Sequence, residues 1–301
     1  MTDWRPDVVL RESAEFASVV AAEAAGIGQL EVAIGMGLVG PGIVELLKDP
    51  LAELSTMAGL PADRGAELLL GGATLTSVPR VLDGDLALGE PQPDRPDDRG
   101  PTWRFRTDAP IEASLPAAWG NPADPLIYVS YGSVTARQPE FAPIYDATLR
   151  TLADLPVRVL MTTGRGLDVA GLEPMPPNTR VEQWWPQEAV MGEAAAVIGH
   201  GGFGTTMAAL AAGVPQVIVP LFSFDQSVHA QRVAEVEAGI QVPGGLAAVA
   251  DLPAALRSVL DDPAFTEGAR AMATEIAALP DIAECPPLLE QLASNRMSAD
   301  E

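Results

Sequence analysis

The fold is decided by the stretch AVIGHGGFGTTMAALAAGVPQVIVP, which spans residues 196–220. The apolar run Ala196–Gly199 predicts a buried strand, and a glycine-rich turn then leads into an apolar helix over Thr206–Ala212. A Gly-Val-Pro break follows, and Gln216–Val219 predicts a second buried strand. A buried strand, a helix and another buried strand are typical of a parallel sheet that helices cover on both faces.

The same alternation runs through the second half of the chain. Apolar segments without polar alternation recur at regular intervals, as strands buried on both faces require. They predict a complete Rossmann-like domain of six strands, at Leu126–Tyr131, Val157–Met161, Thr179–Glu182, Ala196–Gly199, Gln216–Val219 and Ile240–Val242.

The first half of the chain holds fewer strand signals. One helix is expected over Ala14–Ala25, with Ser13 as its cap. A second should follow the glycine-rich loop Gly35–Gly42 and run through about Met57, and a third should begin after Pro61. The proline-rich segment Pro91–Pro101 is expected to be a mobile surface loop. The predicted strands, Asp7–Leu10, Leu30–Ile34, Thr74–Ser77 and Trp103–Phe105, are too few for a complete domain.

We therefore expect an α/β protein with two Rossmann-like domains, of which the N-terminal one is incomplete. The expected boundaries are a partial domain at 1–115, a complete domain at 116–285 and a C-terminal helix or tail at 286–301. An unfinished sheet leaves an apolar edge, and a homodimer is one way to cover it.

Charge and composition exclude several classes of partner. The chain has 18 Lys+Arg against 41 Asp+Glu and a net charge of -23, which repels nucleic acid and anionic membrane surfaces. A single cysteine, Cys285, forms neither an internal disulfide nor a zinc site, which fits the cytoplasm, and no signal peptide is evident. The uncharged run Gly201–Phe224 is broken at Gly213 and indicates a buried helix and strand, not a membrane span.

The turn after Ala196–Gly199 carries the first candidate site. Glycines allow a ligand to approach the backbone closely, and a helix start offers free N–H groups and partial positive charge. Thr205 and Thr206 add hydroxyl donors, and His200 adds a ring N–H, so a diphosphate would suit this turn. A tight turn with a capping threonine and a structural histidine explains the same residues equally well.

Two further clusters follow strand ends. Asp225 and Gln226 could accept from and donate to sugar hydroxyls, although Asp225 could equally be the N-cap of a helix. Trp184 stands just before Pro186-Gln187 and could stack on a nucleobase, although most tryptophans lie in a core.

Taken together, these clusters resemble the donor-binding signature of family 1 glycosyltransferases, which include plant enzymes and antibiotic-modifying bacterial enzymes. The family pattern runs W-x-P-Q, H-x-G-x-x-[ST], G-V-P and P-x-x-x-D-Q. It reads here as Trp184, Pro186 and Gln187; His200, Gly202 and Thr205; Gly213, Val214 and Pro215; and Pro220, Asp225 and Gln226. Tyr131-Gly132-Ser133 and Thr163-Gly164-Arg165 also resemble bacterial members.

The resemblance implies the two-domain GT-B fold and a role for each donor-binding residue. Trp184 would stack on the base and Gln187 would reach the ribose, whereas Asp225 and Gln226 would grip the sugar. The diphosphate would be held by His200, Gly202, Thr205, Thr206 and Ser133, and the expected donor set also includes Arg165, Trp185, Gly201 and Gly204.

The implied activity is that of an inverting, metal-independent hexosyltransferase without a cofactor. It would move a sugar from a TDP- or UDP-sugar to a small hydrophobic natural-product acceptor, such as an antibiotic precursor. The apolar region Gly35–Met57 agrees with such an acceptor.

Two positions depart from the family pattern. Plant members have a glutamate where this chain has Ala208, and the family's catalytic histidine lies near the start of the N-terminal domain. This chain has only His200 and His229, of which His229 is expected on a helix surface. The catalytic base is therefore unknown and expected outside this sequence, with Glu12 as a weak candidate.

Other interpretations stay open at this point. The chain could be a non-catalytic or truncated nucleotide-sugar-binding protein, or a sugar-nucleotide 2-epimerase, although an epimerase leaves Trp184 to Gln187 unexplained. Gly199–Gly204 also matches the dinucleotide motif G-x-G-x-x-G, but after the wrong strand. Asp83-Gly84-Asp85 resembles a metal-binding D-x-D, for which a surface turn is the commoner explanation, and no metal is expected.

Overall fold

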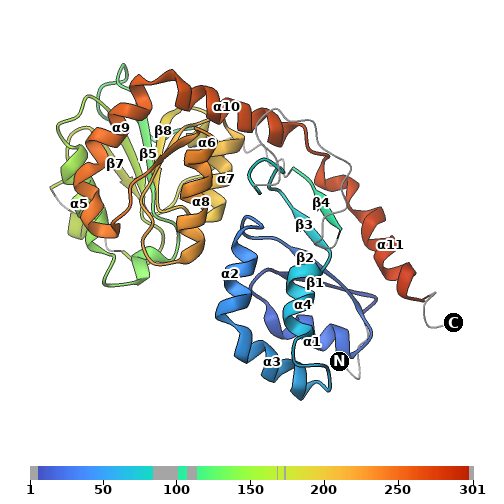
Figure 1. Cartoon of the computed structure of the whole chain (residues 1–301). Coiled ribbons are helices and arrows are strands. Elements are labelled where there is room, and N and C mark those ends of the chain that lie inside the picture. Colours follow the sequence, from blue (N-terminus) through green and yellow to red (C-terminus); the bar gives the residue numbers. More distant parts are fainter. Residues whose placement is uncertain (1–5, 84–100, 107–113, 168, 173, 298–301) are drawn as a thin grey trace. The chain divides into compact units, whose positions relative to one another are not determined.

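The computed structural model describes residues 6–83, 101–106, 114–167, 169–172 and 174–297 (Figure 1). The chain divides into two compact units, one formed by residues 1–108 with 278–301 and the other by residues 109–277. The sequence-based boundaries at 115/116 and 285/286 lie seven or eight residues further along the chain and stay a prediction.

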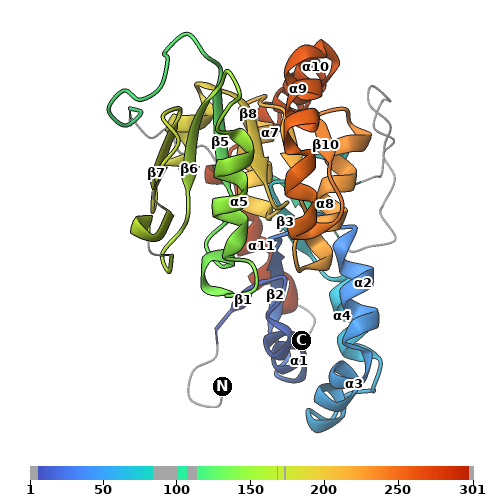
Figure 2. The ribbon, with the colours of Figure 1, turned by 90° about the vertical axis from the view of Figure 1, so that its left-hand side faces the viewer.

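The second unit is built on a six-stranded parallel sheet with the order β10-β9-β8-β5-β6-β7 (Figures 1 and 2). All six predicted strands are confirmed, with ends that differ from prediction by two residues at most. They are β5 Leu126–Ser130, β6 Arg158–Thr162, β7 Thr179–Glu182, β8 Ala194–Gly199, β9 Gln216–Ile218 and β10 Gly239–Gln241.

Helices cover both faces of this sheet, which explains why its strands are apolar throughout. Alternate strand residues such as Ile127 and Val129 pack in one core with α5 (Pro143–Leu152) and α9 (Leu252–Asp261). Their neighbours, including Tyr128, pack on the other face with α6 (Gln187–Met191) and α7 (Phe203–Ala211). Figure 1 shows the two helical layers on either side of the strands. The remaining helices of the unit are α8 (Phe224–Glu235) and α10 (Pro263–Ala277), with short 3-10 turns at Thr135–Arg137, Val169–Leu172 and Gly245–Asp251.

The first unit has a four-stranded parallel sheet with the order β1-β2-β3-β4. Its last helix, α11, follows the whole second unit in sequence and returns to pack on this sheet. Leu288, Leu289 and Leu292 of α11 contact a small core that contains Leu30 and Cys285. The strands are β1 Val8–Glu12, β2 Gly28–Val32, β3 Thr74–Thr76 and β4 Thr102–Arg104, and the helices are α1 Phe16–Ala24, α2 Val39–Leu46, α3 Lys48–Met57, α4 Arg64–Gly71 and α11 Pro286–Met297, preceded by a 3-10 turn at Ile282–Glu284.

Three local predictions for the first unit differ from the structure or lie outside it. The cap of α1 is Glu15, whose carboxylate accepts from the Ser18 N–H at 3.2 Å, because the Ser13 hydroxyl is drawn away to Glu31 at 2.7 Å. The single helix expected up to Met57 is two helices, α2 and α3, with Leu47 between them in a non-helical conformation. Most of the proline-rich segment falls outside the described residues.

Asp83 has a structural role. It is 5% exposed, its carboxylate forms an ion pair with Arg104, and it accepts from the Gly37 N–H at 2.8 Å. A carboxylate held by a guanidinium and a backbone N–H ties β4 to the loop before α2. The other two residues of the Asp-Gly-Asp motif lie outside the described part of the chain.

Replacing Asp83 by alanine should destabilise the first unit strongly, because the buried guanidinium of Arg104 loses its carboxylate partner. Removing one partner of a buried pair typically costs about 3–5 kcal/mol. Denaturant unfolding of the D83A variant measures the loss. The matched control is E67A, at the solvent-exposed Arg64–Glu67 pair, which should cost under about 1 kcal/mol. Equal losses for the two variants would contradict this account of Asp83.

Candidate functional site

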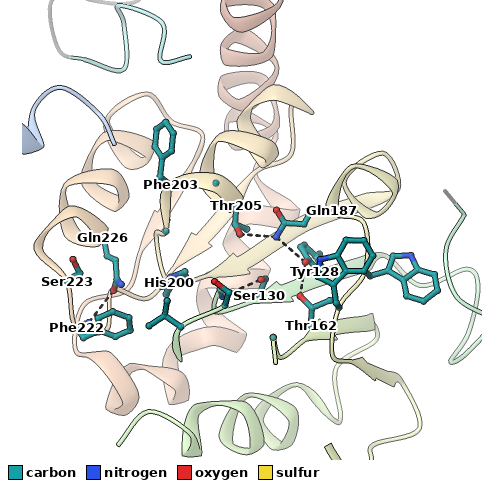
Figure 3. A pocket seen from close by; sticks show the side chains of 18 of the residues that line it. Tyr128, Ser130, Thr162, Gln187, His200, Phe203, Thr205, Phe222, Ser223 and Gln226 are labelled. Carbon is teal, nitrogen blue, oxygen red and sulfur yellow. Dashed lines mark hydrogen bonds between the residues drawn. The ribbon is translucent and has the colours of Figure 1, made fainter. Parts of the chain in front are cut away.

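A pocket of about 460 Å³ opens beyond the carboxyl ends of β5, β6 and β8 (Figure 3). This edge of an open parallel sheet is where such folds bind ligands, and the volume suits a drug-sized molecule. The pocket is lined by Tyr128, Ser130, Gly132, Ser133, Val134, Thr162, Gly164, Gln183, Trp184, Trp185, Gln187, His200, Gly202, Phe203, Gly204, Thr205, Phe222, Ser223, Asp225 and Gln226.

Ten of the thirteen predicted donor-binding residues line this pocket. They are Ser133, Trp184, Trp185, Gln187, His200, Gly202, Gly204, Thr205, Asp225 and Gln226. The structure therefore brings three of the four sequence blocks together around one cavity, and Gly213-Val214-Pro215 is the block that does not line it.

The other predicted residues lie elsewhere. Thr206 is 1% exposed inside α7, and Gly201 is buried in the turn before it. Arg165 is exposed, and its backbone carbonyl accepts from Arg137 Nε at 3.3 Å. Glu12 belongs to the first unit, where its exposed carboxylate accepts from the Ala14 N–H at 2.9 Å, so it stays only a prediction as a base.

Helix α7 begins three residues earlier than predicted. Gly202, in an extended conformation, is its N-cap, and the first bond of the helix runs from the Thr206 N–H to the Gly202 carbonyl at 3.1 Å. The N–H groups of Phe203, Gly204 and Thr205 precede that bond and have no intrahelical acceptor. All three residues line the pocket, so the positive end of the helix dipole faces the cavity.

The His200 ring is held between two glycines. A Cβ built on Gly202 would lie 2.5 Å from the His200 Cε1 atom, and one built on Gly132 would lie 2.8 Å from it. Both distances are too short for any other residue type, so the two glycines allow the ring to sit in the pocket wall.

Burial makes His200 a neutral side chain. It is 8% exposed, and desolvation lowers its pKa from 6.5 to about 4, against a smaller opposite effect of the Asp225 carboxylate and a further lowering by His229. Its Nδ1 atom is buried without a hydrogen-bond partner. Because an unpaired acceptor costs less than an unpaired N–H, we assign the proton to Nε2, on the ring edge that faces the glycines.

A hydrogen-bonded chain of side chains crosses the pocket floor (Figure 3). Gln187 Nε2 donates to the Thr205 hydroxyl at 3.0 Å and to the Tyr128 hydroxyl at 3.2 Å, and Tyr128 also bonds to Thr162 at 2.8 Å. Both hydrogens of the Gln187 amide are thereby used, which leaves its Oε1 to accept from a ligand. The Thr205 hydroxyl accepts from Gln187 and keeps its own hydrogen for an acceptor in the pocket.

The start of α8 forms the opposite wall. Its N-cap is Ser223, so the alternative that Asp225 caps this helix is wrong. Asp225 lies in the first turn and accepts from the Ser223 hydroxyl. Gln226 is 3% exposed, and its Oε1 accepts from the N–H groups of Leu221 and Phe222 at 2.8 and 3.2 Å (Figure 3). Only the Nε2 of Gln226 is left to donate to a ligand.

Sequence reasoning missed several lining residues. Tyr128, Ser130 and Thr162 are polar residues inside apolar strands, and Tyr128 and Ser130 stand two apart, on one face of β5. That spacing could have indicated them. Phe222 contacts Phe141, with ring centroids 5.1 Å apart, and no pattern in the sequence identifies this pair.

The prediction that His229 lies on a helix surface is wrong. It is 0% exposed, and its Nδ1 atom lies 2.7 Å from the Gly201 carbonyl oxygen. The side of α8 that carries His229 faces the β8–α7 turn, which an isolated helical pattern does not reveal.

Within the described residues, no cluster of three or more His, Cys, Asp or Glu side chains is arranged to hold a metal ion. None of the helices seen there is long and apolar enough to cross a membrane.

Comparison with known proteins identifies the family to which the chain is similar. Residues 146–292 match the family described as Erythromycin biosynthesis protein CIII-like, C-terminal domain. The chain is 30% identical to elloramycin glycosyltransferase ElmGT of Streptomyces olivaceus, over 92% of this chain and 66% of ElmGT. It is 30% identical to erythronolide mycarosyltransferase of Saccharopolyspora erythraea, over 96% and 69%, and 29% identical to TDP-daunosamine transferase DnrS of Streptomyces peucetius, over 96% and 68%.

A solved structure agrees over almost the whole chain. The glycosyltransferase SnogD from Streptomyces nogalater superimposes with a TM-score of 0.72 at 27% identity, covering 97% of this chain and 76% of SnogD. The chain thus spans about two thirds to three quarters of the length of these proteins.

The parallel sheets and the pocket at a helix N-terminus define a GT-B glycosyltransferase fold. The chain belongs to the natural-product glycosyltransferases of family 1.

The lowered pKa of His200 makes stability depend on pH. In the unfolded chain this histidine has a pKa near 6.5, whereas in the folded protein its pKa is about 4. Between these two pKa values the unfolded state binds a proton that the folded state does not bind, so the free energy of unfolding decreases as the pH falls from about 6.5 to about 4. At pH 5 the loss is about 2 kcal/mol for this residue. Between pH 7 and pH 5, the H200Q variant should therefore lose about 2 kcal/mol less unfolding free energy than the wild type. Parallel losses in the two proteins would contradict the assignment.

Proposed function

We propose that residues 109–277 bind a nucleoside-diphosphate sugar, and that the protein transfers this sugar to a hydroxyl of a hydrophobic natural-product acceptor, with inversion and without a metal ion. In such a transfer the acceptor hydroxyl gives its proton to a base and its oxygen forms a bond to the anomeric carbon, while the bond to the diphosphate breaks and the nucleoside diphosphate leaves. The observation that carries the proposal is the convergence of the α7 N-terminus, His200 and Thr205 on one pocket.

The diphosphate is the part of the donor that this convergence fits best. Backbone N–H groups at Phe203, Gly204 and Thr205 can donate to phosphate oxygens, and the helix dipole favours their negative charge. The Thr205 hydroxyl, the neutral His200 ring and Ser133 add uncharged donors. These donors supply local positive potential in a chain whose net charge is -23, and they support binding that does not need a metal.

The nucleoside end is supported by two residues. Trp184 is 69% exposed at the pocket wall, so its ring face is open for a base to stack on. The Gln187 Oε1 has no use in the floor network and can accept from a ribose hydroxyl.

The sugar end offers fewer polar groups than the sequence suggested. The Gln226 carbonyl oxygen is used by the backbone, and Asp225 shares its carboxylate with Ser223. Phe222 and Val134, 41% and 53% exposed, add apolar surface to the pocket wall. This mixture favours a sugar with few hydroxyl groups.

Nucleotide binding should survive a chelator and should weaken when His200 is replaced by alanine. A hydrogen bond to a charged group contributes about 1.5–3 kcal/mol, so the dissociation constant for TDP should rise by about 10- to 150-fold. Calorimetry with EDTA present measures this, with S227A as the control, an exposed α8 residue that does not line the pocket. No binding of TDP or UDP by the wild type at millimolar concentration would sink the proposed function.

TDP should bind at least as tightly as UDP. Family 1 plant enzymes have a glutamate at the position of Ala208, and without that carboxylate the site gains little from a 2′-hydroxyl. Ala208 lies on α7 one turn beyond Thr205 and does not line the pocket. The ratio of the two dissociation constants decides the matter, and a tenfold preference for UDP, about 1.4 kcal/mol, counts against the idea.

A further inference from the structure

His229 is a buried polar residue to which the proposed site gives no task. It belongs to α8, three residues after Gln226, and it does not line the pocket. Its Nδ1 atom lies 2.7 Å from the carbonyl oxygen of Gly201, and its ring contacts the Phe203 ring with centroids 5.9 Å apart. It therefore joins α8 to the turn between β8 and α7.

The direction of this hydrogen bond follows from chemistry. A carbonyl oxygen only accepts, so the Nδ1 atom of His229 must carry a proton and donate. Burial lowers the pKa of His229, against weaker opposite effects of the Gly201 carbonyl and Asp225, which keeps the ring neutral with that one proton. The tautomer is thus fixed by the Gly201 carbonyl.

The bonded peptide is the one that joins Gly201 to Gly202, a residue that lines the pocket. Gly201 has a φ of +87°, and a Cβ there would lie 2.6 Å from the Gln226 carbonyl oxygen, so the turn is pressed against the start of α8. In a trans peptide the C=O and the following N–H point in opposite directions. The Gly201 carbonyl points at His229, so the Gly202 N–H points away from His229. Gly202 itself lines the pocket.

We infer that His229 is a positioning residue for the donor diphosphate: by holding the Gly201–Gly202 peptide, it orients the Gly202 N–H and, with it, the adjoining His200 ring and α7 N-terminus. The inference rests on the proposed function. His229 acts through the backbone and touches no ligand. Without it the peptide plane could rotate, and the Gly201 carbonyl would be buried without this partner.

Three substitutions separate a positioning role from simple packing. Asparagine places an amide nitrogen at nearly the same position as the imidazole Nδ1, glutamine places it one bond further out, and leucine fills the space without a donor. TDP affinity of the full chain is measured by calorimetry for H229N, H229Q and H229L, at a temperature where thermal scans show each variant fully folded.

H229L should weaken TDP binding about tenfold, and H229N should restore it to within about threefold of the wild type, with H229Q closer to H229L. Equal affinity of H229L and wild type for TDP would overturn this inference and leave the proposed function standing. So would an H229N variant as weak as H229L, because packing and not the Nδ1 donor would then be responsible. If the wild type binds no nucleoside diphosphate, the proposed function fails and the inference fails with it.

Discussion

The turn between β8 and α7 must satisfy two demands within three residues. It has to redirect the chain from a buried strand into a helix, and it has to leave the first N–H groups of that helix open to the pocket. Glycine at 201 and 202 meets both demands, because Gly201 takes a positive φ and Gly202 leaves room for the His200 ring. The rest of the pocket is arranged around this turn.

Electrostatics explains why the site is built from dipoles. The two histidines near the turn are both neutral, since burial lowers their pKa values, and the carboxylate of Asp225 lies on the opposite wall. In the proposed function, an anionic ligand would then be stabilised by oriented N–H and O–H groups, with both neighbouring histidines neutral. Such groups cost no reorganisation when they are already held, as the Gln187–Thr205 bond and the His229–Gly201 bond indicate.

Much of the fold could be predicted from the sequence, because strands buried on both faces read as unbroken apolar runs. The motifs also identified ten of the twenty residues that line the pocket, since the carboxyl ends of parallel strands meet at one edge. The start of α7 was predicted too late in the chain, because glycines are typical of loops. Gly202 is in fact the N-cap of α7, and Gly204 lies in its first turn. The burial of His229 and the Tyr128–Thr162 bond depend on which elements are neighbours in space. They could not be predicted, because no local sequence pattern indicates the strand order.

The central claim is that the α7 N-terminus holds the diphosphate. The most direct measurement is a titration of the ¹⁵N-labelled chain with TDP, followed by amide NMR. The account predicts that the largest shifts occur at Gly202, Phe203, Gly204 and Thr205, and that they saturate together with the calorimetric binding curve. Saturable binding that leaves these four amides unmoved, with the shifts gathered elsewhere, would contradict it.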